Sequence, residues 1–161
     1  MTHSEPAVAA ADDIGLLCLV ISNGVTEFVL QRLAKAGFED TKFSHGFIVQ
    51  GLLAGDTTVT ELAERLSISV QAVSKTVQEM ESLGYVEKRP DPNDRRSSNL
   101  YLTGRAHANI AAARAARFEI QTQLLQRLGD GGEQFLAQLR SLADRFGGLA
   151  TLAERRLRPP V

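Results

Sequence analysis

The segment from Thr58 to Thr103 constrains the fold of this chain more than any other part of it. It reads TVTELAERLSISVQAVSKTVQEMESLGYVEKRPDPNDRRSSNLYLT. Two short helix patterns are followed by a strand pattern, a turn-rich basic loop and a second strand pattern. This order of elements is typical of a winged helix-turn-helix, a shape that fits the grooves of duplex DNA.

Local signals support both helices of the segment. Thr58 and Glu61 have the spacing of a capping box, which begins a helix by satisfying two backbone donors. Ser69 is placed to cap the next helix, and Gly84 is placed to end it. The apolar residues of that second helix recur at helical spacing: Val73, Val77 and Met80. They predict one buried stripe, which leaves the opposite face of the helix exposed.

Helix patterns also flank the segment on both sides. A long helix is expected over residues 12–36, capped by Asp12 or Asp13, and its early part is apolar on more than one face. A short helix is expected from Ser44, as its cap, to Leu53. No Gly or Pro interrupts residues 105–128. A last helix carries an apolar seam close to a heptad repeat: Phe135, Leu139, Leu142, Phe146, Leu149 and Ala153.

The sequence therefore predicts one mainly α domain over residues 1–161. Within it, residues 44–103 form a winged helix-turn-helix head, and residues 12–36 and 104–158 form long terminal helices. The apolar seam of the terminal helices exceeds what so small a core needs. We expect it to join two copies of the chain as a homodimer, although it could also cover only its own domain.

Composition narrows the class of protein. The net charge of −1 excludes a uniformly basic coat for nucleic acid, but a site-specific binder needs only local positive charge. The single cysteine, Cys18, has no partner for an internal disulfide. The acidic start lacks the features of a secretory signal. The apolar run from Leu16 to Ile21 is far shorter than the ~20 residues that span a bilayer. We expect a cytoplasmic protein without a membrane partner.

The exposed face of the second helix carries side chains suited to a DNA groove. Gln pairs with adenine, Lys with guanine or phosphate, and Ser with base or backbone, while a small apolar residue can contact a thymine methyl. The helix N-terminus also suits a phosphate oxygen. The residues expected to contact double-stranded DNA from this helix are Ser69, Gln71, Ala72, Ser74, Lys75 and Gln78. A merely solvated polar face is the alternative, and the strand-loop-strand that follows disfavours it.

The whole segment resembles the MarR family of bacterial transcriptional regulators. The resemblance is carried by TELAERLSISVQAVSKTVQEMESLGYVEKRPDP and by a D-x-R pattern, formed here by Asp94, Arg95 and Arg96, ahead of Leu102 and Thr103. It implies a homodimeric DNA-binding regulator, usually a repressor. Two heads about one helical turn apart would read a palindromic operator.

The resemblance also implies roles for individual residues. Arg96 would enter the minor groove, where the negative potential favours arginine, and Asp94 would support the wing by pairing with a basic side chain. Arg95 would either reach a phosphate or face water. A small aromatic ligand, commonly phenolic in this family, would bind between the head and the dimer helices. Phe43, His45 and Phe47 are the candidates to line that pocket.

Alternative functions rest on fewer residues. Cys18 lies about where hydroperoxide-sensing members of the family carry a reactive thiol, but Ser22 and Arg32 replace their tyrosines, so a small buried hydrophobic residue is the competing interpretation. A winged module that binds protein instead of DNA would lack the cations of this wing. The sequence contains no motif for an enzyme, a cofactor or a metal site, and His3, His45 and His107 lack metal-ligand spacing.

Overall fold

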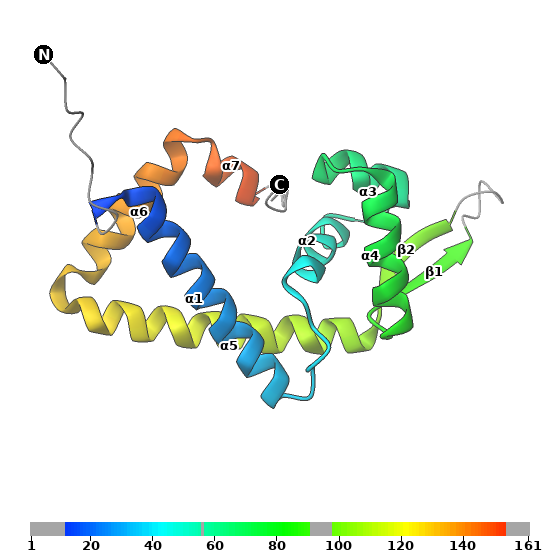
Figure 1. Ribbon diagram of the computed structural model, residues 1–161, viewed down its shortest axis with the longest axis horizontal. Coiled ribbons are helices and arrows are strands. Elements are labelled where there is room, and N and C mark those ends of the chain that lie inside the picture. The colour runs from blue at the N-terminus through cyan, green and yellow to red at the C-terminus, as the bar shows by residue number, and fades with distance from the viewer. Residues whose placement is uncertain (1–11, 56, 91–97, 154–161) are drawn as a thin grey trace, which may run out of the picture.

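The structure is a computed structural model that describes residues 12–55, 57–90 and 98–153. Figure 1 shows a winged head at one end of the long helix α5 (Gly104–Leu128), with the C-terminal helices at its other end. Helix α1 (Ile14–Lys35) crosses and packs against α5. The predicted fold class, mainly α with a winged helix-turn-helix head between long terminal helices, is confirmed.

The head consists of three helices and a hairpin. Its elements are α2 (Phe43–Leu52), α3 (Val59–Leu66), α4 (Val70–Ser82), β1 (Val86–Pro90) and β2 (Ser98–Leu102). The strands pair antiparallel, with Val86 opposite Leu102 and Arg89 opposite Asn99. Backbone atoms of Thr57 and Leu100 add one bridge beside the hairpin, through a hydrogen bond of 3.0 Å from Leu100 N to Thr57 O. The hairpin is thereby tied to the segment that begins α3.

Caps fix where the helices of the head begin. Thr58 Oγ1 accepts a hydrogen bond from Glu61 N at 3.3 Å, and the Glu61 carboxylate accepts one from Thr58 N at 2.8 Å. Ser69 Oγ accepts from Ala72 N at 3.2 Å and starts α4. These caps agree with the sequence. The expected Ser44 cap of α2 is wrong: the N-cap is Lys42, two residues earlier, and the ring of His45 supplies the acceptor for its amide.

Left-handed backbone conformations set the two sharp corners of the head. Ser67 has φ 54° between α3 and α4, and Gly84 has φ 75° between α4 and β1. Glycine adopts this conformation without a Cβ penalty. At Gly84, the Tyr85 amide bonds to Met80 O at 2.8 Å, which satisfies a carbonyl at the end of α4.

One continuous core fills the head. It is built from buried residues of α2, α3, α4, the hairpin and the turn before it, and the start of α5: Ile48, Leu52, Leu62, Ala63, Leu66, Val73, Val77, Met80, Tyr85, Val86, Leu100 and Ala106. Each large apolar side chain buried in this way contributes about 1.5–3 kcal/mol relative to exposure. A smaller cluster of Val29, Leu33 and Ala116 holds α1 against α5.

The C-terminal part contains a short turn and two helices. They are η2 (Gly129–Gly131), α6 (Gly132–Arg145) and α7 (Gly148–Ala153). Gly147 has φ 69° and separates α6 from α7, so the last helix pattern of the sequence forms two helices.

Helix α1 is long and apolar enough to cross a membrane when judged by length and composition alone. The mean hydropathy of its most apolar 18-residue window is 1.6, and 6% of that window is buried within the chain. A single such helix near the N-terminus is weak support for a membrane span, because the core helix of a soluble protein and a signal sequence meet the same criteria. The short apolar run considered from sequence alone therefore understated how apolar this helix is.

Gly51 and Gly46 offer a matched test of head packing within α2. A Cβ added at Gly51 would lie 2.3 Å from Leu62 Cδ1, whereas one at Gly46 would meet no atom within 4 Å. Overpacking costs about 1–3 kcal/mol and exceeds the gain of about 1 kcal/mol in helix propensity. We expect Gly51→Ala to lower the free energy of unfolding by about 1 kcal/mol. Gly46→Ala should leave it unchanged or raise it, as measured by urea titration at fixed protein concentration.

Candidate nucleic-acid interface

Helix α4 presents a polar face because its apolar stripe is fully engaged in the core. Val73 and Val77 are 0% exposed and Met80 is 1% exposed. On the other side, five of the six residues predicted to contact DNA are exposed, and Ser74 is half-buried. The residues concerned are Ser69, Gln71, Ala72, Ser74, Lys75 and Gln78. The structure therefore brings together the surface that the periodicity of the sequence predicted.

The base of the wing is held by ion pairs. Lys88 Nζ lies 2.8 Å from Glu81 Oε2, and the Arg89 guanidinium pairs with Glu87 while its Cζ lies 4.6 Å from the ring centre of Tyr101. These cations are thus partly neutralised by neighbouring acids. Asp94, Arg95 and Arg96 lie outside the described residues, so their predicted roles at the wing tip stay predictions.

A polar cluster, which we call the hinge cluster, joins the head to α5. It consists of Asp40, Thr41, Tyr85, Arg105 and Asn109. The Tyr85 hydroxyl donates a hydrogen bond to Asp40 Oδ1 at 2.5 Å, and Arg105 Nη2 lies 3.0 Å from Asp40 Oδ2. Asn109 Nδ2 donates to Thr41 Oγ1 at 2.8 Å. Sequence reasoning missed this cluster because its members are up to 69 positions apart and share no motif.

The hydrogen bond from Tyr85 is the main reason that the pKa of Asp40 is lowered, and nearby Arg105 acts in the same direction. Burial of the Tyr85 ring raises the pKa of its hydroxyl. The guanidinium of Arg105 also lies over the Tyr85 ring, with Cζ 4.9 Å from the ring centre. The cluster thus pairs an ionised carboxylate with a neutral phenol and a cation, and it is complete only when head and α5 are docked.

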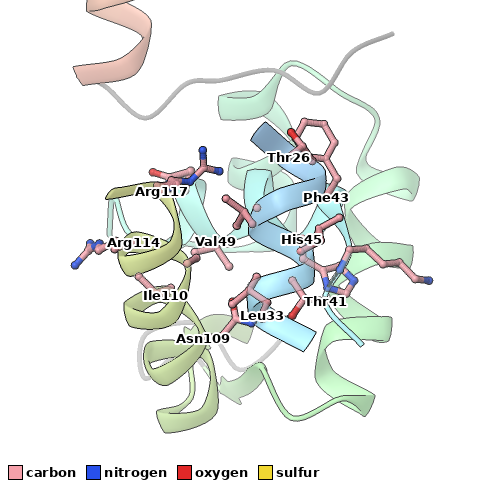
Figure 2. Close-up of a pocket in the computed structure, with 16 residues that line it drawn as sticks. Thr26, Leu33, Thr41, Phe43, His45, Val49, Asn109, Ile110, Arg114 and Arg117 are labelled. Carbon is pink, nitrogen blue, oxygen red and sulfur yellow. Dashed lines mark hydrogen bonds between the residues drawn. The ribbon is translucent and has the colours of Figure 1, made fainter. Parts of the chain in front are cut away.

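A cavity of about 160 Å³ lies between the head and the α1–α5 pair. Phe43 and His45 line it, as predicted. Phe47 does not: its ring meets Phe43 edge-on, with centroids 5.1 Å apart, and it packs against the head core. Arg114 and Arg117 of α5 also line the cavity, whereas Phe43 and His45 come from α2. Figure 2 shows the Arg114 guanidinium turned away from the other lining side chains. Sequence reasoning did not identify these two arginines.

Comparison with known proteins supports the same fold. The sequence profile of the MarR family matches residues 50–97. YusO from Bacillus subtilis superposes with a TM-score of 0.67 at 21% identity, covering 88% of this chain and 99% of that chain. FabT from Streptococcus pneumoniae, solved in complex with DNA, gives 0.64 at 20% identity, covering 86% and 96%. Apo MarR from E. coli gives 0.61 at 22% identity, covering 81% and 96%.

The resemblance to the MarR family is confirmed. The chain has the fold of a MarR-family transcriptional regulator, and the profile match covers the winged head from α2 into the wing. No curated protein matches the chain. At 20–22% identity the three structures establish the fold alone, so the roles of individual residues in this chain are argued from its own geometry.

Cys18 lies at a second, larger hollow of this MarR fold. The hollow has a volume of about 660 Å³ between α1, α5 and α6, and its lining is predominantly apolar. Cys18 is exposed in the single chain, so the expectation that its side chain is buried is wrong for the monomer. Arg32 is bound to Glu119 by two hydrogen bonds of 2.9 and 2.6 Å, and it therefore serves the α1–α5 contact.

The described residues contain no group of three or more His, Cys, Asp or Glu side chains that could hold a metal ion. Two groups of polar side chains, the hinge cluster and the neighbourhood of His45, lie near the junction of the winged head with the long helices.

The hinge cluster makes the stability of the MarR fold depend on the charge of Asp40. A carboxylate with a lowered pKa contributes stability above its unfolded pKa, and this contribution is lost as pH falls through the folded pKa. We expect Asp40→Asn to lower the free energy of unfolding by about 1 kcal/mol at neutral pH, allowing for partial exposure. The difference from wild type should vanish in acid, when denaturant titrations are repeated across pH. Glu39→Gln, at the exposed neighbouring position, should change neither the free energy of unfolding at neutral pH nor its dependence on pH.

Proposed function

We propose that this protein is a homodimeric DNA-binding transcriptional regulator, a repressor that reads a palindromic operator and is released from it by a small-molecule ligand. The observation that carries the proposal is the polar face of α4, which its buried stripe turns outward beside the wing. The location that follows from this function is the cytoplasm.

The composition of the α4 face suits base recognition. Gln71 and Gln78 can pair with adenine, and Lys75 can donate to guanine or to phosphate. None of these three side chains is engaged by an ion pair described above, and all are exposed. The N-terminus of α4 at Ser69 suits a phosphate oxygen, because unpaired amides and the helix dipole favour an anion there. FabT, which shares the fold, was solved in complex with DNA.

Two copies of the head are needed for tight and specific binding. A two-fold axis that separates the recognition helices by about one helical turn reads half-sites spaced by ~10 bp. The terminal helices supply the surface for such a dimer. Large apolar side chains on α1, α5 and α6 remain exposed in the single chain, among them Val20 at 67%, Phe118 at 74% and Phe146 at 85%.

An apolar surface of this kind is not stable in water as a monomer. The seam predicted from sequence, with Phe135, Leu139 and Leu142, lines the large hollow against α1. A second copy of the chain would cover the hollow and the outer face of α1 together. This assembly also accounts for the high mean hydropathy of α1 without a membrane.

The ligand would occupy the smaller cavity between head and long helices. A cavity of 150 Å³ holds one benzene ring, and the volume here is about 160 Å³. Arg114 and Arg117 line the same cavity, which favours an anionic group on the ligand. A single-ring aromatic acid or phenol therefore fits in size and charge. Its site touches both α2 of the head and α5, so binding can change their relative position.

The competing functions have less support. A redox regulator would use Cys18, which is accessible in the single chain but lies in the apolar hollow that the proposed dimer covers. A protein-binding winged module would not need the exposed Lys75 or the cationic wing. Salt titration distinguishes the protein-binding alternative from DNA binding, because the affinity for DNA falls steeply with salt concentration through counterion release.

Replacing Lys75 tests the reading face directly. Duplexes are first selected from a random pool by the wild-type protein, and binding is then measured by fluorescence anisotropy. We expect Lys75→Ala to lose about 1–3 kcal/mol of binding free energy and to relax preference at one position of each half-site. Arg96→Ala should weaken binding strongly as well, since an arginine in the minor groove is lost. Arg140→Ala, which removes an exposed cation on α6 far from the head, serves as the control.

If the Lys75 and Arg96 variants both bind DNA with wild-type affinity, and their circular dichroism spectra match that of the wild type, the proposed interface is contradicted. A flat response of the wild-type protein to salt would favour the protein-binding alternative instead.

Charge substitution within the seam tests the dimer. We expect Leu139→Asp to shift the protein from dimer to monomer in sedimentation experiments, because a carboxylate would be buried without a partner. Ala137→Asp introduces the same charge on the opposite face of α6 and should remain dimeric. DNA affinity should fall only in the Leu139 variant. A wild-type monomer at micromolar concentration would refute the proposed assembly.

A further inference from the structure

His45 is a deeply buried titratable side chain that the proposed function does not use as a switch. It is the third residue of α2 and is 3% exposed. Its ring lies between the cavity and the head core, 6.3 Å from the ring centre of Tyr85. Buried polar atoms normally have hydrogen-bond partners, so the partners of both ring nitrogens of this histidine matter for the stability of the fold.

The first ring nitrogen has a clear structural task. His45 Nδ1 accepts a hydrogen bond from the backbone amide of Lys42 at 3.2 Å and thereby caps the start of α2. A nitrogen that accepts carries no proton, so the proton of the neutral ring sits on Nε2. The cap of α2 therefore exists only while His45 is neutral.

The second ring nitrogen has no hydrogen-bond partner among the described residues. The nearest charged atom is Glu79 Oε1, at 3.7 Å, which is too long for a hydrogen bond. Glu79 belongs to α4, and its carboxylate is already paired with Lys42 Nζ. Lys42 thus contributes to two contacts at this corner: its amide caps α2 through His45, and its ammonium binds the recognition helix through Glu79.

Charged groups from every neighbouring element face this corner. Lys42 and Asp40 lie on the segment before α2, Glu79 on α4, and the Tyr85 hydroxyl after α4. Arg114 and Arg117 of α5 line the same cavity. Glu79 and Asp40 favour a charged His45, whereas Lys42 opposes it.

We propose that His45 is a proton-operated latch between α2 and the recognition helix α4: while the ring is neutral, the capped α2 and the Lys42–Glu79 pair hold the two helices in the DNA-reading arrangement, and protonation disrupts both contacts and rearranges the helices. The inference rests on the proposed DNA-binding function for its readout, although the latch itself can be tested without DNA.

The structural consequence of protonation follows from the two nitrogens. A proton on Nδ1 removes the acceptor of the Lys42 amide, so α2 loses the bond that caps its first turn. The imidazolium Nε2–H then attracts the Glu79 carboxylate, in competition with Lys42, whose ammonium it repels. Both changes alter the position of α4 relative to α2 and therefore weaken DNA binding.

The resting state is the neutral one. Burial lowers the pKa of His45 below its ordinary value, and Lys42 adds to this effect while Glu79 partly opposes it. The unfolded chain binds the proton more readily than the folded one. Stability is therefore fully present above the unfolded pKa and is lost as pH falls below it. The latch is closed at neutral pH and opens on acidification.

The first experiment observes the ring itself in the full-length protein. Long-range ¹H–¹⁵N spectra should show His45 as the Nε2–H tautomer at neutral pH, titrating below the ordinary pKa of histidine. Glu79→Gln removes the carboxylate that would receive the imidazolium, and it should move the His45 titration to still lower pH. A proton on Nδ1, or a titration at the ordinary pKa of histidine, would overturn the proposal whatever the protein binds.

The second experiment measures affinity for a duplex selected by the wild-type protein at neutral pH. We expect affinity to fall about tenfold between about pH 7.5 and about pH 5.5, a coupling of ordinary size. Acidification otherwise adds positive charge and strengthens DNA binding, so a loss has the opposite sign to the general electrostatic effect. His45→Asn keeps a short acceptor for the Lys42 amide but cannot titrate, and it should remove the loss.

His107→Gln is the matched control, because it removes a histidine that is exposed on α5. It should show the same acid-induced loss of DNA affinity as the wild type. An acid-induced loss that persists in His45→Asn would overturn the latch while leaving the DNA-binding function intact. Failure of the wild-type protein to select any duplex at neutral pH would instead count against the proposed function.

Discussion

The burial of one stripe along α4 governs what this protein can present to a partner. Val73, Val77 and Met80 enter a core shared with α3 and the hairpin, and no rotation of the helix could expose them without losing several kcal/mol. The polar residues on the opposite side are thereby fixed outward in one arrangement. A reading surface of this kind costs little further entropy on binding, because the backbone that carries it is already ordered.

In the proposed dimer, the head must also be held in a defined position relative to the helices that join the two copies. That task falls to polar contacts more than to apolar ones. The hinge cluster links Asp40, Tyr85 and Arg105 across the junction, and the Arg32–Glu119 pair fixes α1 on α5. Polar contacts demand specific geometry and can exchange partners, whereas a packed core resists small shifts. A junction built from them suits a protein whose two parts must be able to move relative to each other.

Periodicity and capping chemistry made the fold readable from sequence. The capping box at Thr58, the stripe of α4 and the left-handed Gly84 are local features, and each was found where the sequence predicted it. The Ser44 cap was wrong because histidine is not among the usual capping residues, and here the His45 ring accepts from the Lys42 amide three positions earlier. The arginines at the cavity could not be inferred, because α5 is polar over much of its length and periodicity does not say which cations meet the head.

The position of Arg117 links the two hollows of the molecule. It lines both the small cavity beneath the head and the large apolar hollow between α1, α5 and α6. Cavity-facing residues of α1 continue from one hollow into the other, through Ser22 and Val25 to Thr26 and Val29. If a second copy fills the large hollow, the same stretch of α1 and α5 bears on the dimer and on the ligand cavity. A ligand that engages Arg117 then acts on a side chain that also borders the dimer contact, so ligand binding and the spacing of the two heads are coupled through one rigid helix pair.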